Sequence, residues 1–237
     1  MGLKFNRKKE RHLLLSLIYR LNKIMPFPTK KKFKLFLDLA WIFHRLAHEA
    51  SFRYYKEENH PIRNKEQDFL LQEIKPTDRV LDLGCKHGYI SSIIADKAKL
   101  VVGIDYDAVA IANAQNAHSK NNLKFIVGDA NKHLEETNER YEVLILSHVI
   151  EHLDEPFKLL KQIAPLFERI YIEVPDYQAS LLNEYRKDLN VKLQYLDADH
   201  IYEFDRSDLH QGLNNAGIDQ IKSDYIYGVQ KLWCKPN

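Results

Sequence analysis

Three aspartates stand near the ends of short apolar segments, where their carboxylates could bind a polar small molecule. Asp82 lies two residues before Gly84, Asp105 ends a second apolar segment, and Asp129 follows a third. A carboxylate beside a glycine turn repels a pyrophosphate and attracts a cationic amine. Asp105 could accept both hydroxyls of a ribose, and Asp129 could accept from an exocyclic amine. These acids favour a ligand with an ammonium group over a nucleotide phosphate.

The turn from Gly84 to Gly88 differs from the two common phosphate-binding loops. A dinucleotide-binding loop has three spaced glycines, and here Lys86 and His87 stand where further glycines are expected. A P-loop needs Gly-Lys-Ser/Thr, which the turn lacks. The turn follows the apolar run 80–83 and precedes isoleucines at helical spacing. It therefore predicts a strand, a tight backbone corner and a helix N-terminus that a ligand can approach closely.

Apolar runs and the amphipathic segments between them predict the elements that position these residues. The runs have the composition of buried parallel strands, and they alternate with helical patterns. Gly228 is expected to lie in a terminal hairpin. Asp107 and Asp154 are expected to cap two of the helices. The expected strands begin near residues 80, 100, 123, 141, 169, 218 and 229.

Four blocks of the chain resemble the motifs of class I S-adenosylmethionine-dependent methyltransferases in order and spacing. The resemblance covers roughly residues 65 to 235. It implies an α/β fold with a Rossmann-like, seven-stranded, mostly parallel sheet, an antiparallel last strand and helices on both faces. The implied domains are a basic helical extension or lid (1–62) and the methyltransferase domain (63–237). The matching blocks are Val80–Gly88, Val102–Asp105, Val127–Ala130 and Val143–His152.

The resemblance also implies the cofactor and its binding residues. The cofactor would be S-adenosylmethionine, converted to S-adenosylhomocysteine, and no metal is expected. Asp82 and the backbone of the glycine turn, with Cys85 inside it, would hold the methionine portion. Asp105 would bind the ribose, and the adenine and sulfonium would be bound by the remaining residues. Those residues are Tyr106, Asp129 and Ala130 at the adenine, and Ser147 and His148 near the sulfonium.

A general base must lie near the methyl group when the acceptor is a hydroxyl. His152 is the first candidate, because a neutral imidazole suits proton abstraction near pH 7. His200 is the second, and Glu151 is also within reach in the sequence. Alternatively, the Glu-His pair caps a helix or orients a loop. Residues 148–152 also spell the H-x-x-E-H pattern of a zinc protease, but that pattern requires one helix, and here a strand is expected to end.

Charge divides the chain into a basic N-terminal arm and an acidic body. Residues 1–34 carry eleven Lys/Arg and one acid, whereas the remainder carries 24 basic and 32 acidic residues. Residues 1–25 predict a basic amphipathic helix, and Met25-Pro-Phe-Pro28 ends it. The segment 1–28 is expected to lie on an anionic membrane surface or an acidic partner, or to pack on the domain as an ordinary helix. Nucleic acid is not expected as a partner.

Composition indicates a globular chain in a reducing compartment. Cys85 and Cys234 lie far apart without metal-ligand spacing, and no apolar run has the length of a membrane span. A cytoplasmic protein, peripheral to the inner face of the membrane, is expected.

The expected activity is methylation of a small molecule. The segment 41–63 is loosely similar to the lead-in of bacterial methyltransferases associated with surface glycan biosynthesis, which favours O-methylation of a sugar or glycan precursor. A quinone precursor or another metabolite is the alternative acceptor. A non-catalytic adaptor with the same fold is a further alternative, to which only Lys86 points.

Overall fold

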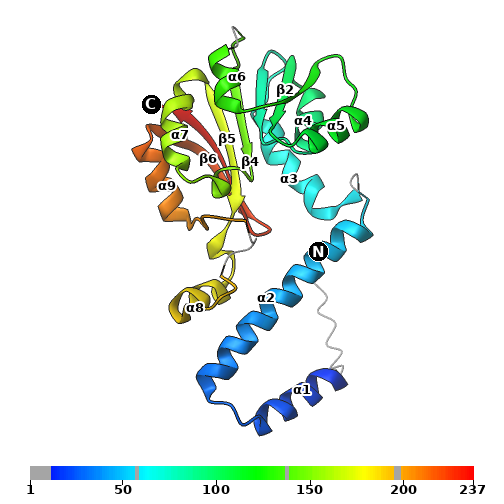
Figure 1. Ribbon diagram of the computed structural model, residues 1–237, viewed down its shortest axis with the longest axis vertical. Helices are drawn as coiled ribbons and strands as arrows, with labels where there is room; N and C mark the ends of the chain where they lie inside the picture. The colour runs from blue at the N-terminus through cyan, green and yellow to red at the C-terminus, as the bar shows by residue number, and fades with distance from the viewer. Residues whose placement is uncertain (1–11, 57–58, 137–138, 195–198) are drawn as a thin grey trace, which may run out of the picture.

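The protein is an α/β domain with a helical arm extending from it (Figure 1). The computed structural model describes residues 12–56, 59–136, 139–194 and 199–237. Seven strands form one sheet in the order β3-β2-β1-β4-β5-β7-β6. Only β7 runs antiparallel to its neighbours, so the predicted fold and its antiparallel last strand are confirmed. The strands are β1 (Arg79–Leu83), β2 (Leu100–Asp105), β3 (Leu123–Val127), β4 (Val143–Ser147), β5 (Arg169–Pro175), β6 (Ile218–Ile226) and β7 (Val229–Pro236).

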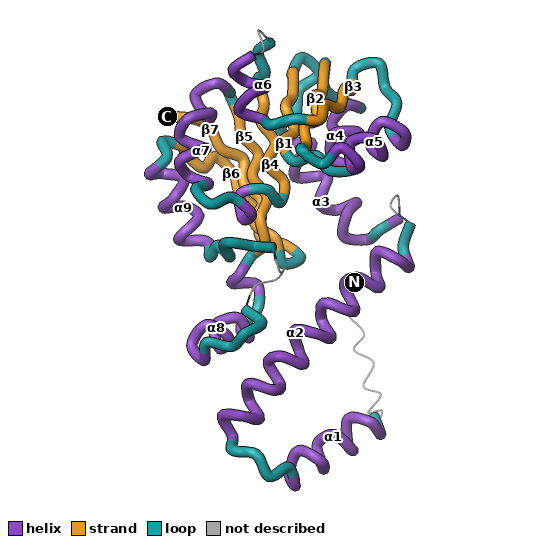
Figure 2. Tube along the Cα trace, in the orientation of Figure 1, coloured by secondary structure: helices purple, strands orange, loops and turns teal. Residues whose placement is uncertain are grey.

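Alternating side chains of the strands form two apolar layers, one on each face of the sheet. Val80, Val101 and Val143 pack against α3 and α4, whereas Leu81 and Leu144 pack against α7 and α9. Burial of every strand centre on both faces is the reason that the strands read as continuous apolar runs. The tube view shows the helices on both sides of the strands (Figure 2). The helices of these layers are α3 (Pro61–Gln72), α4 (Tyr89–Ala95), α5 (Ala108–Ala117), α6 (Ala130–Glu136), α7 (Pro156–Ile163) and α9 (Arg206–Asn215).

The strand order reverses between β1 and β4, which lie side by side although two strands separate them in the chain. Val80 pairs in register with Val101 of β2 and with Val143 of β4. In open parallel sheets, ligands bind beyond the carboxyl ends of the strands at such a reversal. The residues that follow β1, β2 and β4 therefore meet at one edge of the sheet.

An arm of two helices extends away from the sheet. It comprises α1 (Leu13–Ile24) and α2 (Thr29–Tyr54), and α8 (Leu181–Leu189) packs on α2. Arg186 of α8 donates to the Leu37 carbonyl, and Phe33 meets Tyr185 edge-on at 5.4 Å between centroids. The helix predicted within residues 1–25 is confirmed for the described part. It does not pack as an ordinary core helix, because α1 has no buried residue.

Among the described residues, no helix combines the length and apolar character needed to cross a bilayer.

Candidate active site

The glycine corner between β1 and α4 bends repeatedly into the left-handed backbone region. The φ angle is 70° at Gly84 and 75° at Gly88, values that glycine adopts without steric cost. Lys86 between them has φ of 45°, which costs a residue with a Cβ about 1–2 kcal/mol. The Lys86 side chain is exposed. Lysine at this position therefore strains the turn without filling the corner.

Close contacts make three glycines necessary at this edge of the sheet. A Cβ on Gly88 would lie 2.3 Å from Phe125 Cζ, and one on Gly103 would lie 2.9 Å from Cys85 Sγ. A Cβ on Gly84 would lie 2.8 Å from Val149 Cγ2. This last contact shows that the segment following β4 lies directly against the glycine corner.

Asp82 is a buried carboxylate beneath the corner. Its side chain accepts a 2.5 Å hydrogen bond from the Ser91 hydroxyl of α4. Burial raises the pKa of Asp82 to about 7, against the opposing effect of the Ser91 hydrogen bond, and the nearby Asp105 contributes to the rise. A cationic group placed here would recover the desolvation cost of the ionised form. The predicted preference for an ammonium group therefore has a physical basis in the fold.

Asp105 fixes the corner to the end of β2. Its two carboxylate oxygens accept from the backbone amides of Lys86 and Asp107, both at 2.9 Å. Each oxygen of a carboxylate has a second lone pair, so the group can still accept from the hydroxyls of a ribose. Asp105 thus has a structural role that was absent from the sequence-based expectation.

The other residues expected at the cofactor lie along the same edge. Tyr106 is 88% exposed, and Asp129 is exposed at the start of α6, where it accepts from the Lys132 amide. Ser147 ends β4 and is half-buried. Cys85 is buried, and burial raises the pKa of its thiol, so a thiolate nucleophile is disfavoured. The side chain of Ala130 lies outside the described part of the chain.

His148 is held between two buried glutamates. Its Nδ1 lies 3.0 Å from Glu151 Oε1 and its Nε2 lies 3.5 Å from Glu173 Oε1. Burial disfavours the charged imidazole, but the two carboxylates outweigh it and raise the pKa of His148 well above its ordinary value. His148 is therefore an imidazolium at neutral pH, which suits it for electrostatic positioning rather than for accepting a proton.

Glu173 and Lys231 belong to this network, and the sequence reading missed both. They face each other across the antiparallel pair of β5 and β7. The Tyr171 hydroxyl donates to Glu173 at 2.5 Å. Lys231 is fully buried, and its Nζ has no hydrogen-bond partner among the described residues. The available signal was a charged residue inside each of two apolar strands, which is costly unless the charges compensate each other.

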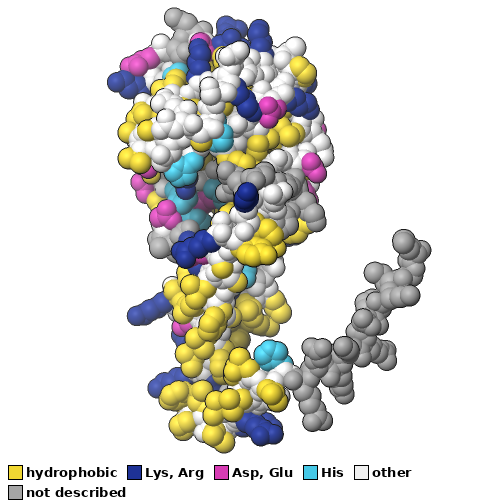
Figure 3. Space-filling view, turned by 90° about the vertical axis from the view of Figure 1, so that its right-hand side faces the viewer, with side chains coloured by type: hydrophobic (Ala, Val, Ile, Leu, Met, Phe, Trp, Pro, Cys, Tyr) yellow, Lys and Arg dark blue, Asp and Glu magenta, His cyan; other side chains and the backbone are white. Residues whose placement is uncertain are grey.

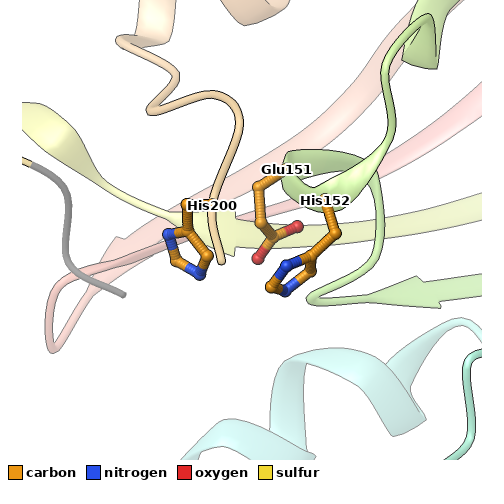
Figure 4. A group of neighbouring side chains, drawn as sticks. All are labelled: Glu151, His152 and His200. Atoms are coloured by element: carbon orange, nitrogen blue, oxygen red, sulfur yellow. The ribbon is translucent and has the colours of Figure 1, made fainter. Parts of the chain in front are cut away.

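The three residues considered as the base converge on one point (Figure 4). Ligand atoms of Glu151, His152 and His200 lie within 4.8 Å of one another. Glu151 and His152 come from the 3-10 helix Ile150–His152, and His200 comes from the segment before α9. The amides of residues 201 and 202 donate to the Glu151 carbonyl, at 2.9 and 3.1 Å, and hold the two segments together.

Hydrogen bonds assign the roles within this group, which we call the base cluster. His152 Nδ1 lies 3.2 Å from the Asp199 carbonyl oxygen, so Nδ1 carries the proton and Nε2 is the acceptor. His200 Nδ1 lies 2.9 Å from Glu203 Oε1, and its ring meets the His152 ring at 4.8 Å. Glu151 is fully buried, and its Oε2 has no hydrogen-bond partner within the described part of the chain.

The same cluster offers donor atoms of the kind that bind divalent metals. The zinc protease pattern of residues 148–152 is not formed, however. His148 contacts Glu151 and Glu173, whereas His152 contacts Asp199 and His200, and the helical segment is only three residues long. The two histidines therefore do not share one helix face.

Comparison with known proteins identifies relatives of the same kind. A family model described as "Methyltransferase domain" matches residues 52–222. A ubiquinone biosynthesis O-methyltransferase of Aliivibrio fischeri is 27% identical over 90 residues, which cover 37% of this chain and 38% of that relative. An uncharacterized RNA methyltransferase of Clostridium tetani is 36% identical over 83 residues, which cover 34% of this chain and 18% of the relative. The chain thus covers well under half the length of these curated relatives.

A solved structure shows the similarity in fold. Magnesium protoporphyrin IX methyltransferase from Synechocystis with bound S-adenosylhomocysteine matches with a TM-score of 0.57 and 17% identity. The match covers 84% of this chain and 99% of that one. At this identity the likeness extends to the fold.

Proposed function

Because the chain belongs to the methyltransferase domain family, we propose that it transfers a methyl group from S-adenosylmethionine to a hydroxyl oxygen of a small molecule. The residues of the corner fit the methyl donor. Two glycines leave space where a Cβ would clash, and buried Asp82 suits the ammonium group. When bound, S-adenosylmethionine supplies a methyl group that is already activated by its sulfonium.

One observation carries the assignment of a hydroxyl acceptor. The contact between Gly84 and Val149 brings the glycine corner beside the segment that bears the base cluster. Since the donor is activated, the protein mainly has to orient the nucleophile and remove its proton. A cluster of a half-buried imidazole, a second imidazole and a buried carboxylate next to the donor site suits that task.

The proton transfer follows from the hydrogen bonds of the base cluster. His152 Nε2 accepts the proton of the acceptor hydroxyl while the oxygen forms its new bond to the methyl carbon. The Asp199 carbonyl holds the Nδ1 proton in place, and the Glu151 carboxylate stabilises the imidazolium that results. His200, fixed by Glu203, packs against the His152 ring and limits its rotation. Protonated His148 holds Glu151 in position from the other side.

A sugar or glycan precursor is the acceptor that we place first. A sugar hydroxyl is weakly acidic, so its methylation depends on a base such as His152. A quinone precursor is the second candidate, supported by the name of the Aliivibrio fischeri relative. The exposed side chain of Lys86 argues against the adaptor alternative, because it leaves the glycine corner open.

The test is a transfer assay with methyl-labelled S-adenosylmethionine and a panel of sugar and phenol acceptors. Wild type is expected to label a hydroxyl acceptor. His152→Ala is expected to bind the cofactor normally and to lose about 10²–10⁴-fold in kcat. His210→Ala, which removes an exposed histidine of α9, serves as the control and should retain full activity.

Two results would reject parts of this proposal. Full turnover by His152→Ala would exclude His152 as the base. Labelling of amines or carbon acceptors, with all hydroxyl acceptors left unlabelled, would exclude O-methylation while leaving the cofactor assignment intact.

A further inference from the structure

The N-terminal helix α1 presents a large apolar surface that no part of the described chain covers. None of its twelve residues is buried. Leu13, Leu17, Leu21 and Ile24 fall on one side of the helix at spacings of four, four and three residues, and Leu14 and Ile18 widen that side. The exposed fractions run from 48% at Ile18 to 84% at Leu13. An apolar face of this kind on a short helix requires a partner.

The charges beside this face are all of one sign. Residues 12–34, which we call the basic arm, contain six cations and no carboxylate: Arg20, Lys23, Lys30, Lys31, Lys32 and Lys34. On α1, Arg20 and Lys23 fall on the side opposite the leucine row. The space-filling view shows hydrophobic side chains gathered on the arm with Lys and Arg side chains among them (Figure 3). The combination of an apolar face with a basic margin is typical of helices that lie in an anionic lipid interface.

The basic arm is held as a defined unit rather than as a tail. Lys32 Nζ donates to the Asn22 carbonyl at 2.9 Å and fastens the start of α2 to the end of α1. Further along, α2 is anchored by Leu37, which is 2% exposed, and by the hydrogen bond from Arg186. Phe27, 51% exposed in the connection between the helices, adds to the apolar surface. The arm therefore presents its apolar face at a distance from the sheet (Figure 1).

Charge decides between a lipid surface and a second copy of the chain as the occupant. A symmetric dimer through α1 would place the same six cations of two copies near one another without a carboxylate to compensate them. A membrane that contains anionic lipid supplies both the apolar layer and the opposite charge. The acidic remainder of the chain, with 24 basic and 32 acidic residues from position 35 onward, would in turn favour an orientation away from the lipid.

We propose that the basic arm binds an anionic membrane surface, with the leucine row of α1 in the interface and the lysines at the headgroups. The inference is independent of the methyl acceptor, because it rests on the arm alone. If the proposed function also holds, the arm would bring the active site to acceptors that are anchored in the membrane.

The test is co-sedimentation of the full chain with vesicles. Binding is expected for phosphatidylcholine vesicles that contain phosphatidylglycerol, and much weaker binding for pure phosphatidylcholine. Raising the salt concentration should weaken it. The triple variant Lys23→Glu, Lys30→Glu, Lys31→Glu should bind at least about 100-fold more weakly, since each cation near such a surface is worth about 1 kcal/mol. All three lysines are exposed, and Lys32 is kept because it holds the helices together.

A matched control separates the arm from the overall charge. Lys124→Glu, Lys161→Glu, Lys192→Glu changes the net charge equally at exposed positions of the body and should bind as wild type does. The apolar half is tested by Leu17→Ser with Leu21→Ser, which should also lose binding. These leucines are 53% and 49% exposed, so the thermal unfolding of this variant should match that of wild type.

Two outcomes would overturn the proposal. Equal loss of vesicle binding in the arm and body variants would show that only net charge matters. Absence of vesicle binding, together with a dimer in light scattering that the leucine variant dissociates, would assign the apolar face to a second copy of the chain.

Discussion

At the scale of single residues, Asp82 links the buried structure to ligand recognition. Its raised pKa means that the free protein carries the cost of a buried charge as pH rises from 3.8 to about 7. In that window the native state binds more protons at this site than the unfolded state does, so Asp82 lowers stability with increasing pH. A bound ammonium group reverses the preference by stabilising the carboxylate.

The pKa of Asp82 gives a testable pH dependence. Below pH 7, binding of S-adenosylmethionine is expected to release a proton, and the affinity should increase by up to about tenfold per pH unit. Calorimetry in two buffers of different ionisation enthalpy measures the proton count. Asp82→Asn should bind more weakly and release no proton. A wild-type affinity that is constant from pH 5.5 to 7 would contradict the role of Asp82.

Residues at the ends of strands could be predicted, and residues paired across the sheet could not. Asp82, Asp105, Gly84 and Gly88 follow directly from the strand and turn pattern. Glu173 and Lys231 become partners only because β7 inserts beside β5, and their separation of almost sixty positions gives no local signal. The convergence of His200 on His152 also depends on the path of the chain between α8 and α9, which the sequence leaves open.

At the scale of elements, cap residues and glycines determine where the site residues lie. Asp107 was correctly predicted as a cap and accepts from the amides of Val109 and Ala110. The prediction for Asp154 was wrong, because α7 begins at Pro156 and Glu155 is its N-cap. Proline is favoured at the first helical position, and here it fixes the start one residue later than the acid suggested.

A pair of glycines tests the close packing between β2 and the glycine corner. Gly103→Ala would bring a Cβ to 2.9 Å from Cys85 Sγ and Ser91 Oγ, and is expected to lower the free energy of unfolding by about 1–3 kcal/mol. Gly128→Ala meets no atom within 4 Å and should be neutral or raise stability by up to about 1 kcal/mol. Urea denaturation of both variants measures the difference. Equal midpoints would show that the corner does not pack tightly on β2.

At the scale of the whole molecule, the fold places two surfaces with different tasks. The carboxyl edge of the sheet gathers the acids, the glycine corner and the base cluster, as the strand order requires. The arm carries cations and leucines away from that edge. The sequence predicted the sheet, its strand directions and the amphipathic first helix. It left open whether that helix packs on the domain, because amphipathicity indicates an apolar partner without specifying which one.

The central claim is that the glycine corner binds S-adenosylmethionine through Asp82 and the corner backbone. The most direct measurement is calorimetric titration of wild type and Asp82→Asn with S-adenosylmethionine and with methylthioadenosine, which lacks the amino-acid portion. We predict micromolar binding of S-adenosylmethionine to wild type, a loss of about tenfold or more in Asp82→Asn, and unchanged binding of methylthioadenosine. Absence of S-adenosylmethionine binding to folded wild type would contradict the account and favour the adaptor alternative.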